Sequence, residues 1–340
     1  MDTTSPIRVI FLITTQPGTA CGVGDYTHQL ANSLRQAEIE VEVVELPAWT
    51  LRTLALLVRV YRSNSDTILH WQYPTLGMGK SPAPAFLPVF FPRRRVFLTL
   101  HEFEQFNALR KIYILLFKLF TNSVVFTNEH ERKVFHRFFP WRGGDGHIIP
   151  IGNNIDVAAF GGVVRRQRLI YFGQIIDGKG LEAFIDVVER LRGRGNSVPC
   201  AIIGTVPDAE SAIARVVRSA AEAFDITLFE GLPADAVSRE LQASSVAFLP
   251  FPDGISDRRG SALACLKHGL AVVTCHSHLT PDWLRRTTYG VTDPDGALAC
   301  IEHLLAEDWP LIPEPEALAE GLAQREWSEI AAAHLRLYHG

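Results

Sequence analysis

The sequence has few of the features that mark secreted, membrane-spanning or nucleic-acid-binding proteins. Its five cysteines are scattered, odd in number and without paired zinc spacing, which argues against a disulfide framework. No apolar run approaches the roughly 20 residues that a membrane-spanning helix needs, and the short polar start does not resemble a signal peptide. A formal charge of -4 gives no reason to expect nucleic acid as a partner. We therefore expect a cytoplasmic protein.

Neither a metal nor a nicotinamide cofactor is expected. Cys275, His276 and His278 crowd together after an expected strand, but adjacent ligands on an extended chain point to opposite faces and no fourth ligand is evident. Gly22 and Gly24 follow the first expected strand, but the third small residue of a dinucleotide fingerprint is missing. These glycines still predict a loop, ahead of a helix from about residue 26, whose backbone closely approaches a ligand.

What the sequence does contain is a repeated alternation of apolar strands and amphipathic helices. A chain of 340 residues is long enough for two domains. Strands and helices alternate from residue 8 to about residue 151, and the alternation restarts at residue 169 after a polar segment. Two such wraps predict an α/β protein made of two Rossmann-like domains that face each other across a cleft.

The strongest single motif lies at residues 246–274. An apolar strand is followed by a polar loop, a helix that begins at Gly260 or Ser261, and a second strand, which together form one βαβ unit. Ligands of open α/β sheets bind beyond the carboxyl ends of the strands, so we expect a ligand in this loop. Free backbone N–H groups at the helix start, together with Arg258 and Arg259, favour a phosphate. The alternative is an ordinary turn with two solvated arginines.

Two further polar residues follow expected strands. Lys179 lies just before a helix, and we expect its ammonium to reach the same sheet edge as Arg258 and Arg259. His101 follows an expected strand of the first domain, where a histidine is suited to orienting a substrate. A solvated lysine and a surface histidine are the alternatives.

Residues 107–120 form an apolar helix pattern that basic side chains interrupt. Together with the basic run at residues 92–95, this helix could make a peripheral contact with an anionic membrane. That contact would place the protein at the inner face of the membrane. The alternative, which we prefer, is burial against the sheet with the lysines extended to solvent.

Seven segments, in order along nearly the whole chain, resemble the retaining glycosyltransferases of family 4, which have the two-domain GT-B fold. The segments are residues 22–24, 98–102, 149–156, 171–180, 229–231, 246–274 and 327–338. The resemblance implies that a nucleotide-diphospho-sugar binds mainly in the second domain and is transferred with retention, without a metal or other cofactor. The acceptor would be a glycan, a lipid-linked glycan or a small molecule, and polysaccharide biosynthesis is the expected setting.

The resemblance also implies that the final helix crosses back to the first domain. Residues 1–155 with 325–340 would then form the acceptor-side domain, and residues 156–324 the donor domain. The expected donor-binding residues are Gly22, Gly24, Gly173, Gln174, Lys179, Asp257, Gly260 and Ser261. The expected catalytic residues are His101, Lys179, Asp253, Arg258 and Arg259. The expected acceptor-side residues are Asp25, Gln72, Tyr73 and Glu102.

The sequence departs from the family pattern at the donor site. Gln174 stands where the family commonly has an arginine, and Ser256 and Ala264 stand where it has two glutamates. From the balance of charge we infer that the arginines and aspartates of the loop at residues 253–259 replace these side chains. A catalytically inactive sugar-nucleotide-binding or scaffold protein of the same fold is the alternative function. A GT-B epimerase and a nicotinamide oxidoreductase are weaker alternatives.

Overall fold

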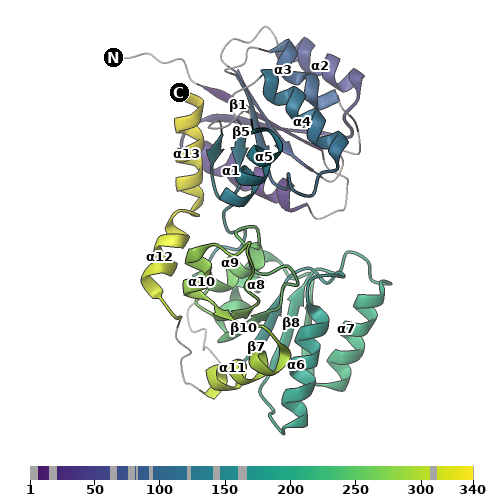
Figure 1. Ribbon diagram of the computed structural model, residues 1–340, viewed down its shortest axis with the longest axis vertical. Helices are drawn as coiled ribbons and strands as arrows, with labels where there is room; N and C mark the ends of the chain where they lie inside the picture. The colour runs from purple at the N-terminus through teal and green to yellow at the C-terminus, as the bar shows by residue number, and fades with distance from the viewer. Residues whose placement is uncertain are drawn as a thin grey trace. The chain divides into compact units, whose positions relative to one another are not determined.

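The computed structural model describes residues 7–14, 21–61, 67–75, 81, 83–91, 95–120, 124–140, 146–159, 167–306 and 312–339. The chain divides into two compact units, Met1–Gly152 with Arg325–Gly340, and Asn153–Gln324 (Figure 1). Each unit is built on one six-stranded sheet whose paired strands all run parallel. The α/β class with two Rossmann-like domains, expected from the sequence, is confirmed.

The first sheet has the strand order β2-β1-β3-β4-β5-β6. Its strands are β1 (Arg8–Thr14), β2 (Glu40–Leu46), β3 (Thr67–Tyr73), β4 (Val96–Leu100), β5 (Val124–Phe126) and β6 (His147–Ile148). The central strands are buried along their length because helices cover both faces of the sheet, and β1 and β5 are largely apolar runs. Along β1, Val9 and Phe11 belong to one buried cluster, while Ile10 and Leu12 belong to the cluster on the opposite face.

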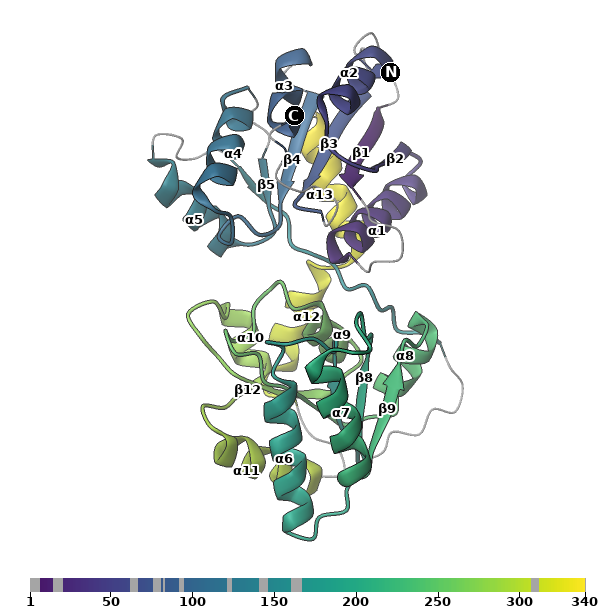
Figure 2. The same cartoon turned by 90° about the vertical axis from the view of Figure 1, so that its right-hand side faces the viewer.

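Different helices cover the two faces of the first sheet. On the face of Val9 and Phe11 pack α1 (Gly22–Gln36) and the C-terminal helix α13 (Trp327–His339), which also contact each other (Figure 2). The opposite face is covered by α2 (Leu51–Tyr61), α3 (Leu87–Phe90), α4 (Ala108–Phe120) and α5 (Glu129–Phe138). The return of the final helix to the first domain is therefore confirmed.

The second sheet has the strand order β12-β11-β10-β7-β8-β9. Its strands are β7 (Leu169–Phe172), β8 (Cys200–Gly204), β9 (Ile226–Glu230), β10 (Val246–Leu249), β11 (Ala271–Thr274) and β12 (Tyr289–Gly290). The helices are α6 (Leu181–Gly193), α7 (Ala212–Ala223), α8 (Ala234–Gln242), α9 (Gly260–Lys267), α10 (Asp282–Thr287), α11 (Pro294–Ala306) and α12 (Pro315–Ala323). α6 packs between α7 and α11, whereas α9 packs on β7 and β11.

Two local expectations were wrong. The glycine loop after β1 is shorter than expected, because α1 already begins at Gly22. The segment before β4, whose glycines and prolines predict a loop, contains α3 and the 3₁₀ turn η2 (Ala83–Phe86). Proline is compatible with the first turn of a helix, where its missing N–H would have had no intrahelical partner. Among the described residues, no helix is long and apolar enough to cross a membrane.

Candidate functional site

Two loops of the second unit meet beyond the carboxyl ends of β7 and β10. Gly180, with φ at +83°, lies so close to Pro250 that an added Cβ would overlap the carbonyl oxygen of that proline. Both the left-handed backbone and the close approach require glycine here. This packing fixes the loop that carries Lys179 beside the loop that carries Arg258 and Arg259, at the sheet edge where open α/β sheets bind ligands.

Tyr171, which the sequence did not indicate as a site residue, connects the two loops. Its hydroxyl donates a hydrogen bond of 3.3 Å to the backbone carbonyl of Lys179. Burial raises the pKa of the Tyr171 phenol, and the nearby positive charge of Arg259 partly offsets this. The structure therefore brings the Lys179 backbone and the Arg259 guanidinium to the same tyrosine. The signal that could have found Tyr171 is its place at the end of a buried strand directly before the loop.

The side chain of Arg259 is held from two directions. Its guanidinium pairs with the carboxylate of Asp253 and lies 4.6 Å from the centre of the Phe251 ring. The side chain is only 17 % exposed, so its position is largely fixed before any ligand arrives. Asp257 accepts a hydrogen bond of 3.0 Å from the indole N–H of Trp283. Both loop aspartates are therefore engaged within the second unit.

The start of α9 offers fewer free N–H groups than expected. The N–H of Gly260 donates to the Arg258 carbonyl at 3.2 Å, and the N–H of Ala262 donates to the Arg259 carbonyl at 3.0 Å. The expectation that the N–H groups of Gly260, Ser261 and Ala262 are all free was wrong for Gly260 and Ala262, because the chain turns tightly into the helix. Ser261 is half-buried at this helix start, where the helix dipole still favours an anion.

Two further predicted donor residues, Gly173 and Gln174, lie directly after β7. The N–H of Gly173 donates to the Ile203 carbonyl at 3.0 Å, and Gln174 is half-buried next to it. Ser256 and Ala264, at the positions of the two family glutamates, are both buried. These positions are therefore occupied by small side chains that are packed into the second unit.

In the first unit, His101 lies at the carboxyl end of β4 and joins the end of β3. Its backbone N–H donates to the Tyr73 carbonyl at 2.9 Å, and its ring Nε2 lies 2.9 Å from the Gln72 amide oxygen. Because an amide oxygen only accepts, Nε2 carries the hydrogen and Nδ1 is left as an acceptor. Burial lowers the pKa of His101 to about 3, and the neighbouring His334 adds to this shift. The ring is therefore neutral at physiological pH.

Tyr26, which the sequence also did not indicate, packs edge-on against His101 with 5.0 Å between the ring centres. Its other side contacts Trp327 of α13 at 5.4 Å. The Tyr26 hydroxyl and the Gln72 amide nitrogen are both buried and make no hydrogen bond within the described part of the chain. Buried polar groups are usually satisfied, so His101 is flanked by groups suited to a polar ligand.

Of the other predicted residues of the first unit, Gly24 is buried, whereas Gly22, Asp25 and Glu102 are exposed. Gly22 and Gly24 form the first turn of α1 instead of a loop, and Asp25 follows them on the surface. Glu102 is exposed directly after His101. The first unit thus brings His101, Gln72 and Tyr73 together in the structure.

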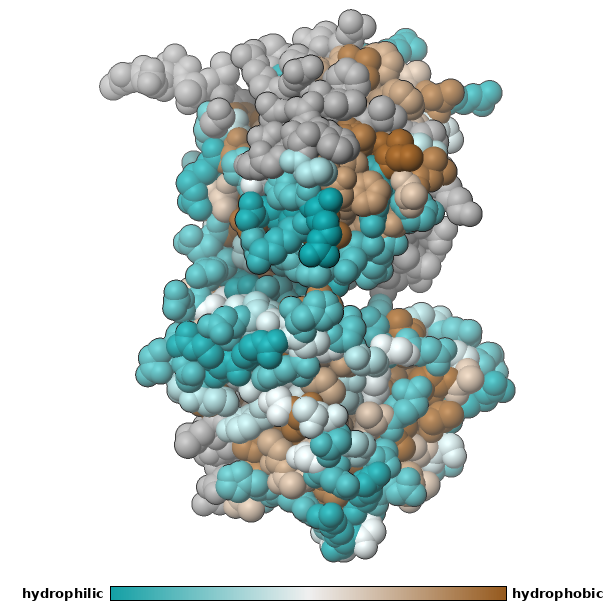
Figure 3. Space-filling view, in the orientation of Figure 1, coloured by the Kyte–Doolittle hydropathy of each residue, from teal (hydrophilic) through white to brown (hydrophobic). Residues whose placement is uncertain are grey.

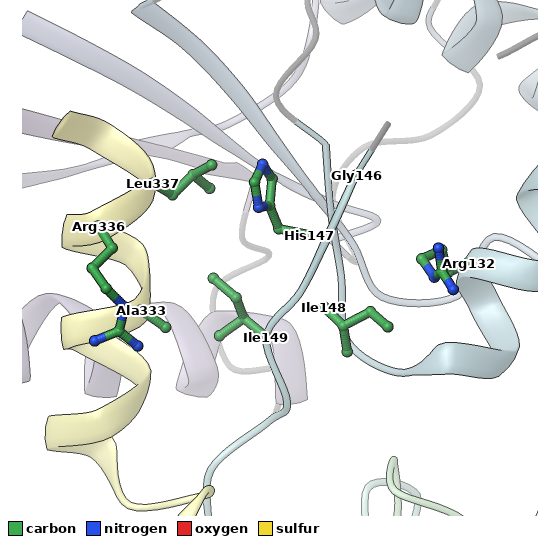
Figure 4. A pocket seen from close by; sticks show the side chains of 8 residues that line it. All are labelled: Arg132, Gly146, His147, Ile148, Ile149, Ala333, Arg336 and Leu337. Atoms are coloured by element: carbon green, nitrogen blue, oxygen red, sulfur yellow. The ribbon is translucent and has the colours of Figure 1, made fainter. Parts of the chain in front are cut away.

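A pocket of about 460 Å³ in the first unit contains none of the predicted residues (Figure 4). It lies along the edge strand β6 and is lined by Arg132, Gly146, His147, Ile148, Ile149, Ala333, Arg336 and Leu337. Arg132 is already paired with Glu129 through two hydrogen bonds of 2.7 and 2.8 Å. The described residues contain no group of three His, Cys, Asp or Glu side chains that could hold a metal ion.

No protein-family model and no curated protein matches this sequence. The fold, in contrast, matches solved structures over nearly their whole length. A glycosyltransferase from Rickettsia africae has a TM-score of 0.72 at 12% identity, covering 98% of this chain and 97% of its own. Anabaena Alr3699/HepE, in complex with UDP and glucose, has a TM-score of 0.69 at 14% identity, with 97% and 98% covered.

The catalytic domain of starch synthase IV from Arabidopsis thaliana, bound to ADP and acarbose, is similar at a TM-score of 0.63 and 12% identity, with 99% of each chain covered. All three are GT-B glycosyltransferases, and the match covers nearly the whole of each chain. Identities this low show the fold alone. The chain has the GT-B fold, as expected from the sequence.

Proposed function

We propose that this protein transfers a sugar from a nucleoside-diphosphate sugar to an acceptor, with retention of configuration and without a metal, as family-4 glycosyltransferases do. The observation that carries the proposal is the meeting of the Lys179 loop and the Arg259 loop at the carboxyl edge of the second sheet. Similar folds support it, because one of them was solved with UDP-glucose and another with ADP.

In this proposal the second unit binds the donor diphosphate. Lys179, Arg258, Arg259 and the α9 dipole supply positive charge where negative charge grows on the leaving group. The diphosphate competes with Asp253 for the Arg259 guanidinium, because both are anions that a guanidinium binds through paired hydrogen bonds. Asp253, once released, is then free to accept hydrogen bonds from sugar hydroxyls.

His101 is proposed to contact the transferred sugar from the first unit. A neutral imidazole adds no positive charge next to a sugar carbon that becomes cationic as the bond to the diphosphate breaks. The acceptor attacks on the face that the diphosphate leaves, and the departing phosphate oxygen takes the acceptor proton. No side chain of the protein then has to act as the base.

A sugar-nucleotide-binding protein without transferase activity is the second candidate. Its support is the pair of small buried side chains, Ser256 and Ala264, at the positions of the two family glutamates. Binding of a nucleotide is common to both candidates. Release of nucleoside diphosphate from a sugar donor, by transfer or by slow hydrolysis, distinguishes them.

The first test is thermal unfolding of the full chain with UDP, GDP, ADP, TDP and their sugar conjugates, each with a chelator present. A nucleotide at about 100 times its Kd should stabilise the folded state by about 2.7 kcal/mol and raise the Tm by several degrees. Arg259→Ala should reduce that shift, because it removes a charge-assisted partner of the phosphate. Arg218→Ala, which changes a surface ion pair with Glu230 in the same unit, is the matched control.

Two results would contradict the proposal. The absence of a Tm shift with every nucleotide, in a sample that unfolds cooperatively, would remove the donor site. An equal shift in the wild-type chain and in Arg259→Ala would place the nucleotide away from the loop after β10.

A further inference from the structure

Neighbouring helices of the first unit leave large apolar side chains exposed on one part of its surface. η2 contacts both α2 and α4, and α3 contacts α4, so these elements share one surface. The exposed side chains are Leu51, Leu56, Val60, Phe86, Val89, Phe90, Leu109 and Ile112, each 40–74 % exposed. Figure 3 shows brown, hydrophobic surface over this part of the unit. We call the exposed face of α2, η2, α3 and α4 the α2–α4 patch.

Other large apolar side chains exposed in the described chain are scattered. They are Phe138, Ile148, Val157 and Val216, which lie on other elements. Contiguous apolar surface on a folded protein usually marks an interaction site, whereas single exposed apolar side chains are normal. The α2–α4 patch is therefore a candidate docking surface.

The charges around the patch indicate what it docks against. The helices α2, α3 and α4 and the turn η2 contain no aspartate or glutamate. α2 instead carries Arg52 and Arg59, both exposed. Apolar side chains next to cations, with no anion among them, match the boundary of an anionic lipid bilayer, which takes up apolar side chains below its phosphates.

The structure changes which residues make this surface. Of the basic residues that suggested a membrane contact in the sequence, Arg95 is buried and donates to the Thr67 carbonyl at 2.8 Å, and Lys118 is fully buried. Arg93 and Arg94 lie outside the described residues. The patch draws instead on α2 and α3, together with the outer face of α4.

The patch adjoins the residues expected on the acceptor side. The Tyr73 ring packs edge-on against Phe106, just before α4, with 4.9 Å between the ring centres. Burial raises the pKa of Tyr73, and the charge of Arg110, in the first turn of α4, opposes the shift. α4 therefore reaches from the apolar surface to the end of β3. The start of the helix that carries Leu109 and Ile112 of the patch therefore lies beside the strand that carries Gln72.

We propose that the α2–α4 patch docks the protein on anionic membranes, so that the acceptor is a lipid-linked molecule presented at the bilayer surface. The docking surface stands on the exposed side chains and charges of the first unit alone. The lipid-linked acceptor rests, in addition, on the proposed transferase function.

The test is co-sedimentation of the full chain, without nucleotide, with vesicles of phosphatidylcholine alone or mixed with phosphatidylglycerol. Binding is expected to the anionic vesicles at low salt and to weaken as salt rises. Leu56→Asp with Ile112→Asp should weaken binding by more than about tenfold, because each change removes an inserted side chain and adds a repelled charge. Arg52→Glu with Arg59→Glu should weaken binding to the vesicles that contain phosphatidylglycerol by about tenfold or more. This variant should not change binding to vesicles of phosphatidylcholine alone.

The matched control is Val216→Asp, a charge placed on an apolar side chain of α7 that is 48 % exposed. This control should bind vesicles as the wild-type chain does. Failure of the wild-type chain to bind, or equal binding by the Leu56/Ile112 variant, would overturn the proposal. So would a dimer in sedimentation velocity that the Leu56/Ile112 variant breaks while vesicle binding is unchanged.

The nucleotide-dependent Tm shift, measured on the same proteins, separates the two proposals. Vesicle binding without any nucleotide shift leaves the docking surface standing and removes the transferase function, and with it the lipid-linked acceptor. A nucleotide shift without vesicle binding removes the docking surface and leaves the donor site.

Discussion

At Gly180 the chain adopts a φ of +83° while its backbone lies against the carbonyl of Pro250. Gly178, two residues earlier, has a φ of +75° but no heavy atom near the position of an added Cβ. Gly178→Ala should therefore destabilise the fold by only about 1–2 kcal/mol, the cost of a left-handed backbone for an L-residue. Gly180→Ala should add about 1–3 kcal/mol more from the overlap with Pro250. Urea unfolding of the two variants measures the difference.

A Gly180→Ala variant as stable as Gly178→Ala would show that the two donor-side loops separate easily. The nucleotide-dependent Tm shift would then have to come from only one of them. If the packing holds as the structure has it, Gly180→Ala should also reduce the nucleotide shift, whereas Gly178→Ala should retain most of it.

In the loops after β7 and β10, single site residues could be predicted from the sequence only where their side chains have an evident chemical role. Lys179 and Arg259 were indicated by their charge and by their place after a strand. Tyr171 and Phe251 were not, because an aromatic side chain near the end of a strand is equally typical of a core. Trp283, in α10, was not indicated either. Which of them contacts a loop depends on packing between segments far apart in the sequence, as in the hydrogen bond from Trp283 to Asp257.

At the scale of elements, α13 is joined to the first sheet by buried histidines. His70 of β3 lies 2.6 Å from the Tyr338 hydroxyl through Nδ1 and 2.8 Å from the Thr99 hydroxyl through Nε2. His334 donates through Nδ1 to the Ile330 carbonyl at 2.9 Å. Burial is the main cause that lowers the pKa of all three histidines of this region, to about 3 for His101, to about 4 for His334, and well below its usual value for His70.

These lowered pKa values predict loss of stability in mild acid. The unfolded chain has histidines with pKa near 6.5, so it binds protons below that pH while the folded chain does not. The stabilisation is therefore complete above about pH 6.5 and declines, by about 1.4 kcal/mol per pH unit for each histidine, as the pH falls toward the folded pKa. Urea unfolding of the wild-type chain between pH 7 and pH 5 measures this slope.

His334→Gln should reduce the dependence of the unfolding free energy on pH by the contribution of one histidine. This expectation does not depend on how the substitution changes the stability at pH 7. His303→Gln, on α11 of the second unit, is the matched control for the substitution, because it replaces a histidine outside this region. A wild-type stability that stays constant from pH 7 to pH 5 would mean that these histidines are protonated in the folded chain as readily as in the unfolded one.

The elements themselves were largely predictable, for a physical reason. Strands buried on both faces are continuous apolar runs, as in β1 and β10, and such runs need no partner to be recognised. The predicted start of α1 was wrong because glycines such as Gly22 and Gly24 favour a loop in the local sequence. In the fold, these two glycines form the first turn of the helix. The buried contacts of α13 join residues such as His70 and Tyr338, which no local pattern relates.

At the scale of the whole molecule, the first unit is built from two separate parts of the chain. Ile330, Ala331 and Tyr338 of α13 are buried against Val9 and Phe97 of the first sheet. Burying one large apolar side chain contributes about 1.5–3 kcal/mol, and a domain is stable by only about 5–15 kcal/mol in total. Removal of residues 325–340 should therefore unfold the first unit or lower its Tm by many degrees.

The truncated chain still contains the whole second unit, because the core of this unit is formed by residues between Asn153 and Gln324. Calorimetry of the chain ending at Gln324 should therefore show one surviving transition. If the donor binds mainly in the second unit, as we propose, that transition should still move to higher temperature with the nucleotide that stabilises the full chain. Loss of both transitions would mean that the second unit depends on the first for its stability. A surviving transition whose Tm does not change with the nucleotide would mean that the first unit supplies most of the free energy of donor binding. Lys179, Arg258 and Arg259 would then bind the diphosphate only when the first unit is folded.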